Sequence, residues 1–120
     1  MIPSFNVLGG ELTECSIDPL TGWFRDGCCN TDRNDTSLHT ICCVLTADFL
    51  QFAFSKGNNL ITPEPEFKFP GLKPGDQWCV CAQTWQDAYD EGVACSVVLS
   101  STHEETLQVV SLETLQKFAT

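Results

Sequence analysis

Positive charge is what this sequence has least of. Six lysines and arginines stand against 16 aspartates and glutamates, which gives a net charge of −10. Such a surface repels phosphate backbones and anionic headgroups, so we expect neither nucleic acid nor membrane as a partner. No stretch approaches the roughly 18 apolar residues of a membrane span, and Met1 to Asn6 has neither the basic nor the apolar segment of a secretory leader. We therefore expect a cytoplasmic protein, whose oligomeric state the sequence does not indicate.

A C-x-x-C motif is also absent, although the chain is cysteine-rich. An even, dense set of cysteines is typical of disulfides in a secreted chain. Here the density falls below the roughly 8 to 10 per cent of disulfide scaffolds, and the chain is long enough to build its own core. We therefore expect most of the thiols to be reduced. The eight cysteines are residues 15, 28, 29, 42, 43, 79, 81 and 95.

The hydrophobic periodicity predicts one α+β domain over residues 1–120. The clearest element is a helix over 47–56, capped by Thr46, with Phe49, Leu50 and Ala53 facing inward. Strands and helices interleave irregularly, which favours a two-layer sandwich of a mixed or antiparallel sheet with about three helices and long ordered loops. The predicted strands are 37–45, 78–81, 97–99, 106–110 and an edge segment at 5–10; further helices begin with a cap at Thr84 and at Ser111.

Two long loops, 18–37 and 58–76, are rich in turn residues, and loops of this length are often functional. The first contains Arg25-Asp26-Gly27, and the second contains Pro70-Gly71 and Pro74-Gly75. We expect these loops to meet near His39 around a pocket for a small ligand. The candidate ligand-binding residues are Arg25, Asp26, His39, Asp76 and Trp78.

Thiolates and imidazoles are preferred ligands of zinc and iron, so a metal is the other ligand that the sequence suggests. The candidate metal ligands are Cys42, Cys79, Cys81, His39 and His103. Their spacing does not decide the matter, because residues three apart on a strand face opposite sides. Cys79 and Cys81 share a face but lie roughly 6.5 to 7 Å apart along a strand, too far to pair with each other.

Two other functions stay open. In the first, the chain is a thiol-dependent enzyme with Cys29 or Cys79 as the nucleophile and His39 or His103 as its base. In the second, the cysteines are buried and free and only pack, as in a structural or interaction protein. The sequence favours a small-ligand or metal-binding domain and leaves open whether the chain is an enzyme.

Short motifs spread over almost the full length of the chain, from Asn6-Val7-Leu8-Gly9 through Arg25-Asp26-Gly27 to Thr102-His103-Glu104, resemble the pattern of the DUF2237 family of small proteins. The resemblance implies a shared α+β fold and pocket, and brings no activity, cofactor or catalytic residue with it. Among the cysteines, residues 15, 29, 42, 79 and 81 match the family pattern. The resemblance runs through Asn6-Val7-Leu8-Gly9, Asp18-Pro19, Thr21-Gly22, Arg25-Asp26-Gly27, His39-Thr40 with Cys42, Gly57-Asn58, Phe69 to Asp76, Trp78-Cys79, Cys81-Ala82 and Thr102-His103-Glu104.

Overall fold

The computed structural model describes residues 4–120 and has the α+β architecture that the sequence predicts. The leader pattern considered above falls partly on Met1–Pro3, outside the described residues. Within residues 4–120, every helix is too short or too polar to cross a bilayer. The elements are β1 (His39–Val44), α1 (Ala47–Ser55), β2 (Gln77–Cys81), α2 (Ala82–Asp90), β3 (Ser96–Val97) and α3 (Leu112–Gln116), with 3-10 turns at Pro65–Phe67, Leu99–Ser101 and Glu104–Gln108.

The sheet has the strand order β2-β1-β3, and both pairings are antiparallel. Side chains alternate between its faces, as the period of a strand requires. Ile41 of β1 and Val80 of β2 are register partners and join the main apolar core. Cys42 and Cys79, one position along each strand, are also partners and lie in a separate buried cluster on the other face.

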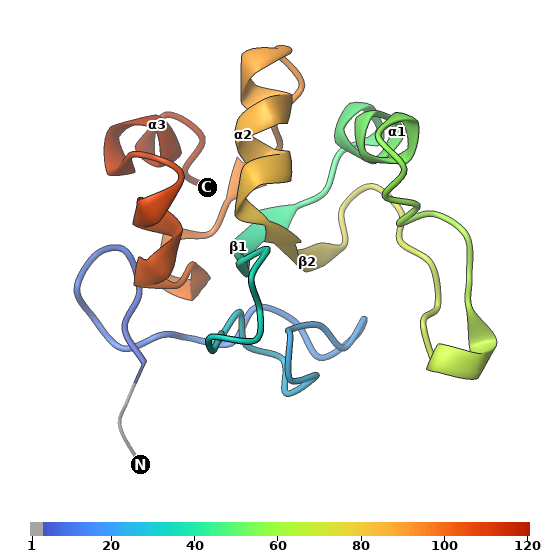
Figure 1. Cartoon of the computed structure of the whole chain (residues 1–120), viewed down its shortest axis with the longest axis horizontal. Helices are drawn as coiled ribbons and strands as arrows, with labels where there is room; N and C mark the ends of the chain where they lie inside the picture. The colour runs from blue at the N-terminus through green and yellow to red at the C-terminus, as the bar shows by residue number, and fades with distance from the viewer. Residues whose placement is uncertain (1–3) are drawn as a thin grey trace.

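Helices cover the first face of the sheet. In Figure 1, α2 rises directly from the β1–β2 pair, with α1 and α3 on either side. Thr46 caps α1 by accepting a hydrogen bond from the Phe49 amide at 3.1 Å, and Phe49 is fully buried. Leu50 and Ala53 are buried too, which confirms the helix and its inward face. Phe54, on the same helix, is 48% exposed.

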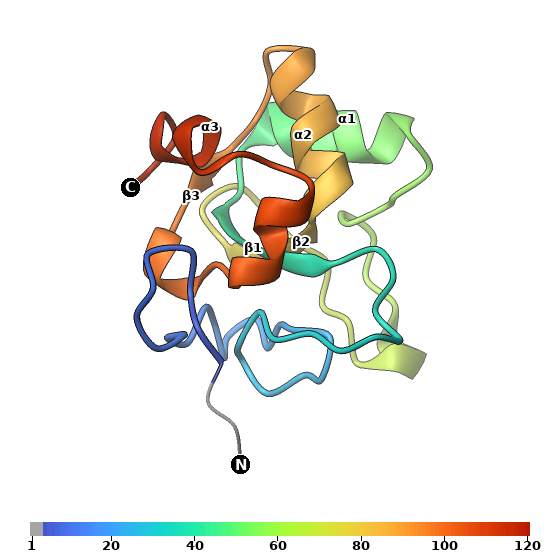
Figure 2. The ribbon, with the colours of Figure 1, turned by 60° about the vertical axis from the view of Figure 1, so that its left-hand side comes forward.

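An irregular loop, the covering loop of residues 4–38, covers the second face of the sheet. Both ribbon views place the N-terminal segment, blue to cyan, beneath the sheet on the side away from α2 (Figures 1 and 2). Two disulfides, Cys15–Cys42 and Cys29–Cys79, join this loop to β1 and β2. The expectation that most thiols are reduced is therefore wrong for this structure, where four cysteines are paired and four are free. The loop leaves Ile17, Leu20 and Phe24 largely exposed, so it buries few large apolar side chains against the sheet, and the disulfides hold it there.

Three predicted local structures are corrected. The strand predicted at 106–110 is not formed, because its first residues belong to the 3-10 turn Glu104–Gln108. The Thr106 hydroxyl lies 2.7 Å from that of Thr40 inside the core, and this buried contact outweighs the strand propensity of a β-branched residue. Helix α2 starts at Ala82, so Thr84 is inside the helix and is not its cap. The segment at 5–10 makes only isolated bridges, Phe5 to Glu11 and Asn6 to His103.

Candidate functional site

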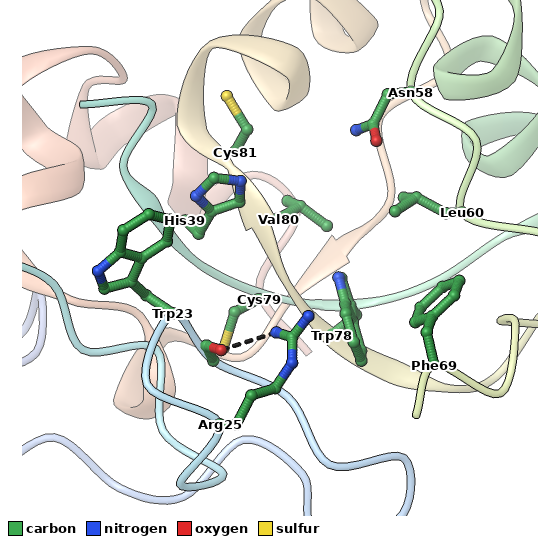
Figure 3. Close-up of a pocket in the computed structure, with 11 residues that line it drawn as sticks. Trp23, Arg25, His39, Asn58, Leu60, Phe69, Trp78, Cys79, Val80 and Cys81 are labelled. Carbon is green, nitrogen blue, oxygen red and sulfur yellow. Dashed lines mark hydrogen bonds between the residues drawn. The ribbon is translucent and has the colours of Figure 1, made fainter. Parts of the chain in front are cut away.

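A cavity of about 380 Å³ opens beside the end of β2. The loop that contains Arg25, the strands β1 and β2, and the loop that contains Asn58 and Phe69 each supply part of its wall. Figure 3 shows their side chains converging on the cavity. A cavity of this size is in the range of small-molecule sites. It is lined by Gly22, Trp23, Arg25, His39, Asn58, Leu60, Phe69, Trp78, Cys79, Val80 and Cys81.

Arg25 is held at the cavity by a sharp turn of the first loop. Gly22 has a φ of +105°, and a Cβ there would lie 2.4 Å from the Cys28 carbonyl oxygen, so only glycine fits. The Arg25 Nη1 donates to the Gly22 carbonyl at 2.8 Å (dashed in Figure 3). Its guanidinium carbon lies 5.1 Å from the centre of the Trp78 ring. A guanidinium has five N–H donors, so most of them remain free for a ligand.

His39 is oriented by a buried carboxylate. Asp35 is 1% exposed, and its Oδ1 lies 2.7 Å from His39 Nδ1. Its Oδ2 accepts from the His39 backbone amide at 2.9 Å and from the Thr31 hydroxyl at 3.0 Å. The Trp23 ring stacks on the imidazole, with centroids 5.8 Å apart and planes 14° apart. Because Asp35 occupies Nδ1, Nε2 is the nitrogen left for a ligand.

The remaining walls are mostly apolar, with Asn58 contributing a polar amide. Phe69 meets Trp78 edge to face with ring centroids 5.5 Å apart, and Leu60 lies on the same side in Figure 3. Aromatic faces of this kind bind flat or apolar groups. The cavity therefore joins two basic side chains, Arg25 and His39, to a mostly apolar wall.

A free thiol adjoins the histidine. Cys81, half-buried at the end of β2, is the register partner of His39 on β1. In Figure 3 its side chain lies next to the His39 ring, with the sulfur turned away from that ring. Cys79 also lines the cavity, but its sulfur is bonded to Cys29.

The structure brings together three of the five residues that the sequence suggests for ligand binding: Arg25, His39 and Trp78. Asp26 and Asp76 lie outside the cavity because each stabilises a turn. Asp26 accepts from the Cys28 amide at 3.0 Å, and Asp76 accepts from the Lys73 amide at 3.0 Å. The Pro70-Gly71 loop borders a different surface hollow.

The predicted metal ligands and catalytic residues do not all share one site: His39, Cys79 and Cys81 line this cavity, whereas Cys42 and His103 do not. Cys42 and Cys79 belong to two different disulfides, and Cys29 is bonded to Cys79, so none of the three offers a free thiol here. His103 borders a separate hollow, where its Nδ1 accepts from the Glu105 amide at 3.0 Å. Burial lowers the pKa of His103, and the nearby Glu105 and Glu104 oppose that effect.

Asp35, Trp23 and Cys15 matter near the site but are not among the site residues predicted from the sequence. For Asp35 a signal was present, since an acid four residues before a histidine at a strand's start places a hydrogen-bond acceptor within its reach. The residues around Trp23 contain no comparable pattern that predicts its contact with His39. The pairing of Cys15 depends on contacts between segments 27 residues apart, which local patterns do not contain.

Comparison with known proteins agrees with the resemblance. Residues 5–119 match the family described as "Uncharacterized protein conserved in bacteria (DUF2237)". No curated protein matches the chain.

Proposed function

This chain belongs to the DUF2237 family, and we propose that its cavity binds a small organic anion, a carboxylate attached to a flat or apolar body. Arg25 is the binding group for the carboxylate, with His39 Nε2 beside it. Trp23, Trp78 and Phe69 contact the body of the ligand. The observation that carries the proposal is the charge of the cavity wall.

The chain has 16 acidic residues and six basic ones, so a wall chosen at random would be acidic. Among the described residues that line this cavity are one arginine and one histidine and no carboxylate. The buried acid nearby, Asp35, does not line the cavity and makes three hydrogen bonds, to the Thr31 hydroxyl, the His39 amide and His39 Nδ1. Arg25 is thus the one permanently charged side chain among the described residues that line the cavity, on a protein that is otherwise acidic, which favours an anion over a cation.

The arginine also has the geometry for a carboxylate. Arg25 is restrained by the Gly22 carbonyl and the Trp78 ring, so little side-chain entropy remains to be lost on binding. Its planar N–H groups match the two oxygens of a carboxylate. The apolar wall beside it selects a ligand with a ring or short hydrocarbon body over an inorganic ion.

Isothermal titration with matched pairs tests the proposal: benzoate against benzamide, and phenylacetate against phenylacetamide. We expect the carboxylates to bind at least about tenfold more tightly, because a charge-assisted hydrogen bond contributes roughly 1.5 to 3 kcal/mol. Arg25→Gln should remove that preference. Arg33→Gln is the matched control, since Arg33 borders a different hollow.

Equal binding of acids and amides would contradict the proposal. So would equal losses in Arg25→Gln and Arg33→Gln, or no binding of any compound in the panel. Inorganic phosphate belongs in the same titration, and a preference for it over benzoate would contradict the assigned role of the apolar wall.

One observation favours a second function, a thiol-dependent reaction. Asp35 orients the His39 ring through a contact of 2.7 Å between Asp35 Oδ1 and His39 Nδ1. The register of the strands places Cys81 opposite His39. A carboxylate, an imidazole and a thiol in this order form the usual arrangement for activating a cysteine nucleophile. Here the nucleophile is Cys81, in place of Cys29 or Cys79, and its sulfur must first rotate toward the ring. A substrate-dependent covalent adduct on Cys81, seen by mass spectrometry, would support this function.

A further inference from the structure

The four disulfide-bonded cysteines form one compact buried cluster. The sulfur atoms of Cys15, Cys29 and Cys79 all lie within 4.8 Å of one another, and that of Cys42 is bonded to Cys15. The exposed fractions of the four residues range from 0 to 6%. The two disulfides are therefore neighbours in a single closed space.

We propose that, when these two disulfides are reduced, Cys15, Cys29, Cys42 and Cys79 together bind one Zn²⁺ ion. This set differs from the metal ligands that the sequence suggests: it adds two loop cysteines and uses neither histidine nor Cys81. The proposal is independent of the ligand proposed for the cavity.

The donor set and its spacing suit zinc. Structural zinc sites are tetrahedral, four thiolates are a common ligand set, and a Zn–S distance of about 2.3 Å places the sulfurs roughly 3.8 Å apart. The sulfurs of Cys15, Cys29 and Cys79 already lie within 4.8 Å of one another and need only small side-chain rotations to reach that spacing, and the Cys42 sulfur lies beside that of Cys15. Within each disulfide, the two sulfur atoms are roughly 2 Å apart and can separate to that spacing once the bond between them is reduced.

The scaffold holds the ligands from both sides. Cys42 and Cys79 are opposite each other on β1 and β2, so the sheet fixes two of the four positions. Their backbone amides donate to the hydroxyls of Thr102 and Thr21, at 3.2 and 2.9 Å. Cys15 and Cys29 come from the covering loop, and zinc would join loop to sheet as the disulfides do.

One polar side chain also points at the sulfurs. Gln77 Nε2 lies 3.8 Å from the Cys42 Sγ while donating to the Cys15 carbonyl at 2.6 Å. An N–H group directed at a sulfur stabilises the thiolate form that a metal requires. The amide thus supplies an outer contact to one ligand and fixes the backbone of another.

The chemistry balances with a dithiol reductant. Two reductant dithiols transfer four electrons and four protons to the two S–S bonds, giving four protein thiols and two oxidised reductant disulfides. Zn²⁺ then displaces the four protons as it binds four thiolates. Exchange with two small-molecule disulfides reverses the sequence: they accept four electrons and four protons to become dithiols, the two protein S–S bonds re-form and the ion is released. The redox state thus selects a zinc form or a disulfide form. Reducing compartments such as the cytoplasm favour the first.

Cobalt titration of the full-length protein tests the proposal. Protein reduced with a phosphine, freed of metal and kept anaerobic, should bind one Co²⁺ per chain. The expected signals are thiolate-to-cobalt charge-transfer bands and the visible bands of tetrahedral cobalt. One equivalent of Zn²⁺ should abolish them, and the oxidised protein should show neither band.

The variant pair is Cys29→Ser and Cys28→Ser. Cys29→Ser should weaken Zn²⁺ binding more than about 100-fold, since even the loss of an outer contact to a metal ligand costs up to that factor. Cys28→Ser, a matched change at a free, half-buried cysteine outside both the cluster and the cavity, should bind as the wild type does. If Cys29→Ser fails to fold, native mass spectrometry of the reduced wild type decides alone. No zinc adduct in the reduced wild type, or equal losses in both variants, would overturn the proposal.

Discussion

Cys42 and Cys79 lie directly opposite each other on β1 and β2, yet each is bonded to a cysteine of the covering loop and not to the other. The two bonds span 27 and 50 residues. On the loop-closure estimate, bonds of these spans stabilise the fold by about 3.5 and 4 kcal/mol. The loop that carries Arg25 is thus fixed to the strands that carry His39 and Trp78, which is how the cavity acquires a stable wall.

The first prediction counts thiols. Air-oxidised protein, denatured and alkylated without reductant, should gain four labels, because Cys28, Cys43, Cys81 and Cys95 are free. Reduction before alkylation should raise the count to eight. Intact mass measures both, and eight labels without reductant would show that the disulfides do not form.

The second prediction concerns which free thiol reacts first. Burial, with Asp26 and Glu14, raises the pKa of Cys28; burial and the adjacent Cys95 raise the pKa of Cys43 well above its usual value. A raised pKa lowers the fraction of reactive thiolate. Cys81 should therefore be the residue that iodoacetamide labels fastest in the native protein.

Peptide mapping over time measures those rates. His39→Ala should slow the labelling of Cys81, while His103→Ala should leave it unchanged, because His103 borders a different hollow. Faster labelling of Cys28, or equal effects of the two histidine variants, would contradict the assignment of His39 as the partner of Cys81.

The third prediction tests the core. Phe49 is fully buried, so Phe49→Ala should lower the free energy of unfolding by about 3 to 5 kcal/mol in urea titrations. Phe54, on the same helix, is 48% exposed. Phe54→Ala should cost much less, and similar losses in the two variants would contradict the orientation of α1.

Helix α1 and strand β1 could be predicted because their sequence signals are local. Thr46 caps α1, and Phe49, Leu50 and Ala53 recur at helical spacing within one short stretch. The covering loop could not be placed in this way, because Cys15 and Cys29 find their partners only after distant segments meet. Nor could the turn at Thr106, whose conformation depends on the hydroxyl of Thr40 on another element.

The fourth prediction concerns acid stability. Burial lowers the folded-state pKa of His103 below the roughly 6.5 of an exposed histidine. Its neutral Nδ1 also accepts the hydrogen bond from the Glu105 amide, which protonation would break. The stability that His103 contributes is therefore present above pH 6.5 or so, and is lost as the pH falls through the folded-state pKa.

Urea unfolding at several pH values measures this effect. The free energy of unfolding of the wild type, minus that of His103→Asn, should decrease as the pH is lowered from about 7.5 to 5. His39→Asn, which removes the other histidine, shows how much of any change is specific to His103. A difference that grows on acidification would contradict the prediction.

The most direct test of the account is an NMR titration that follows the three indole N–H signals with benzoate. Trp23 and Trp78 line the cavity, whereas Trp85 is buried in the core, where its Nε1 donates to the Cys95 carbonyl at 3.0 Å. Saturable shifts of the Trp23 and Trp78 signals, with Trp85 unmoved and all shifts lost in Arg25→Gln, are the predicted result. No shift of Trp23 and Trp78, or equal shifts of all three, would contradict the claim that this cavity binds a small organic anion.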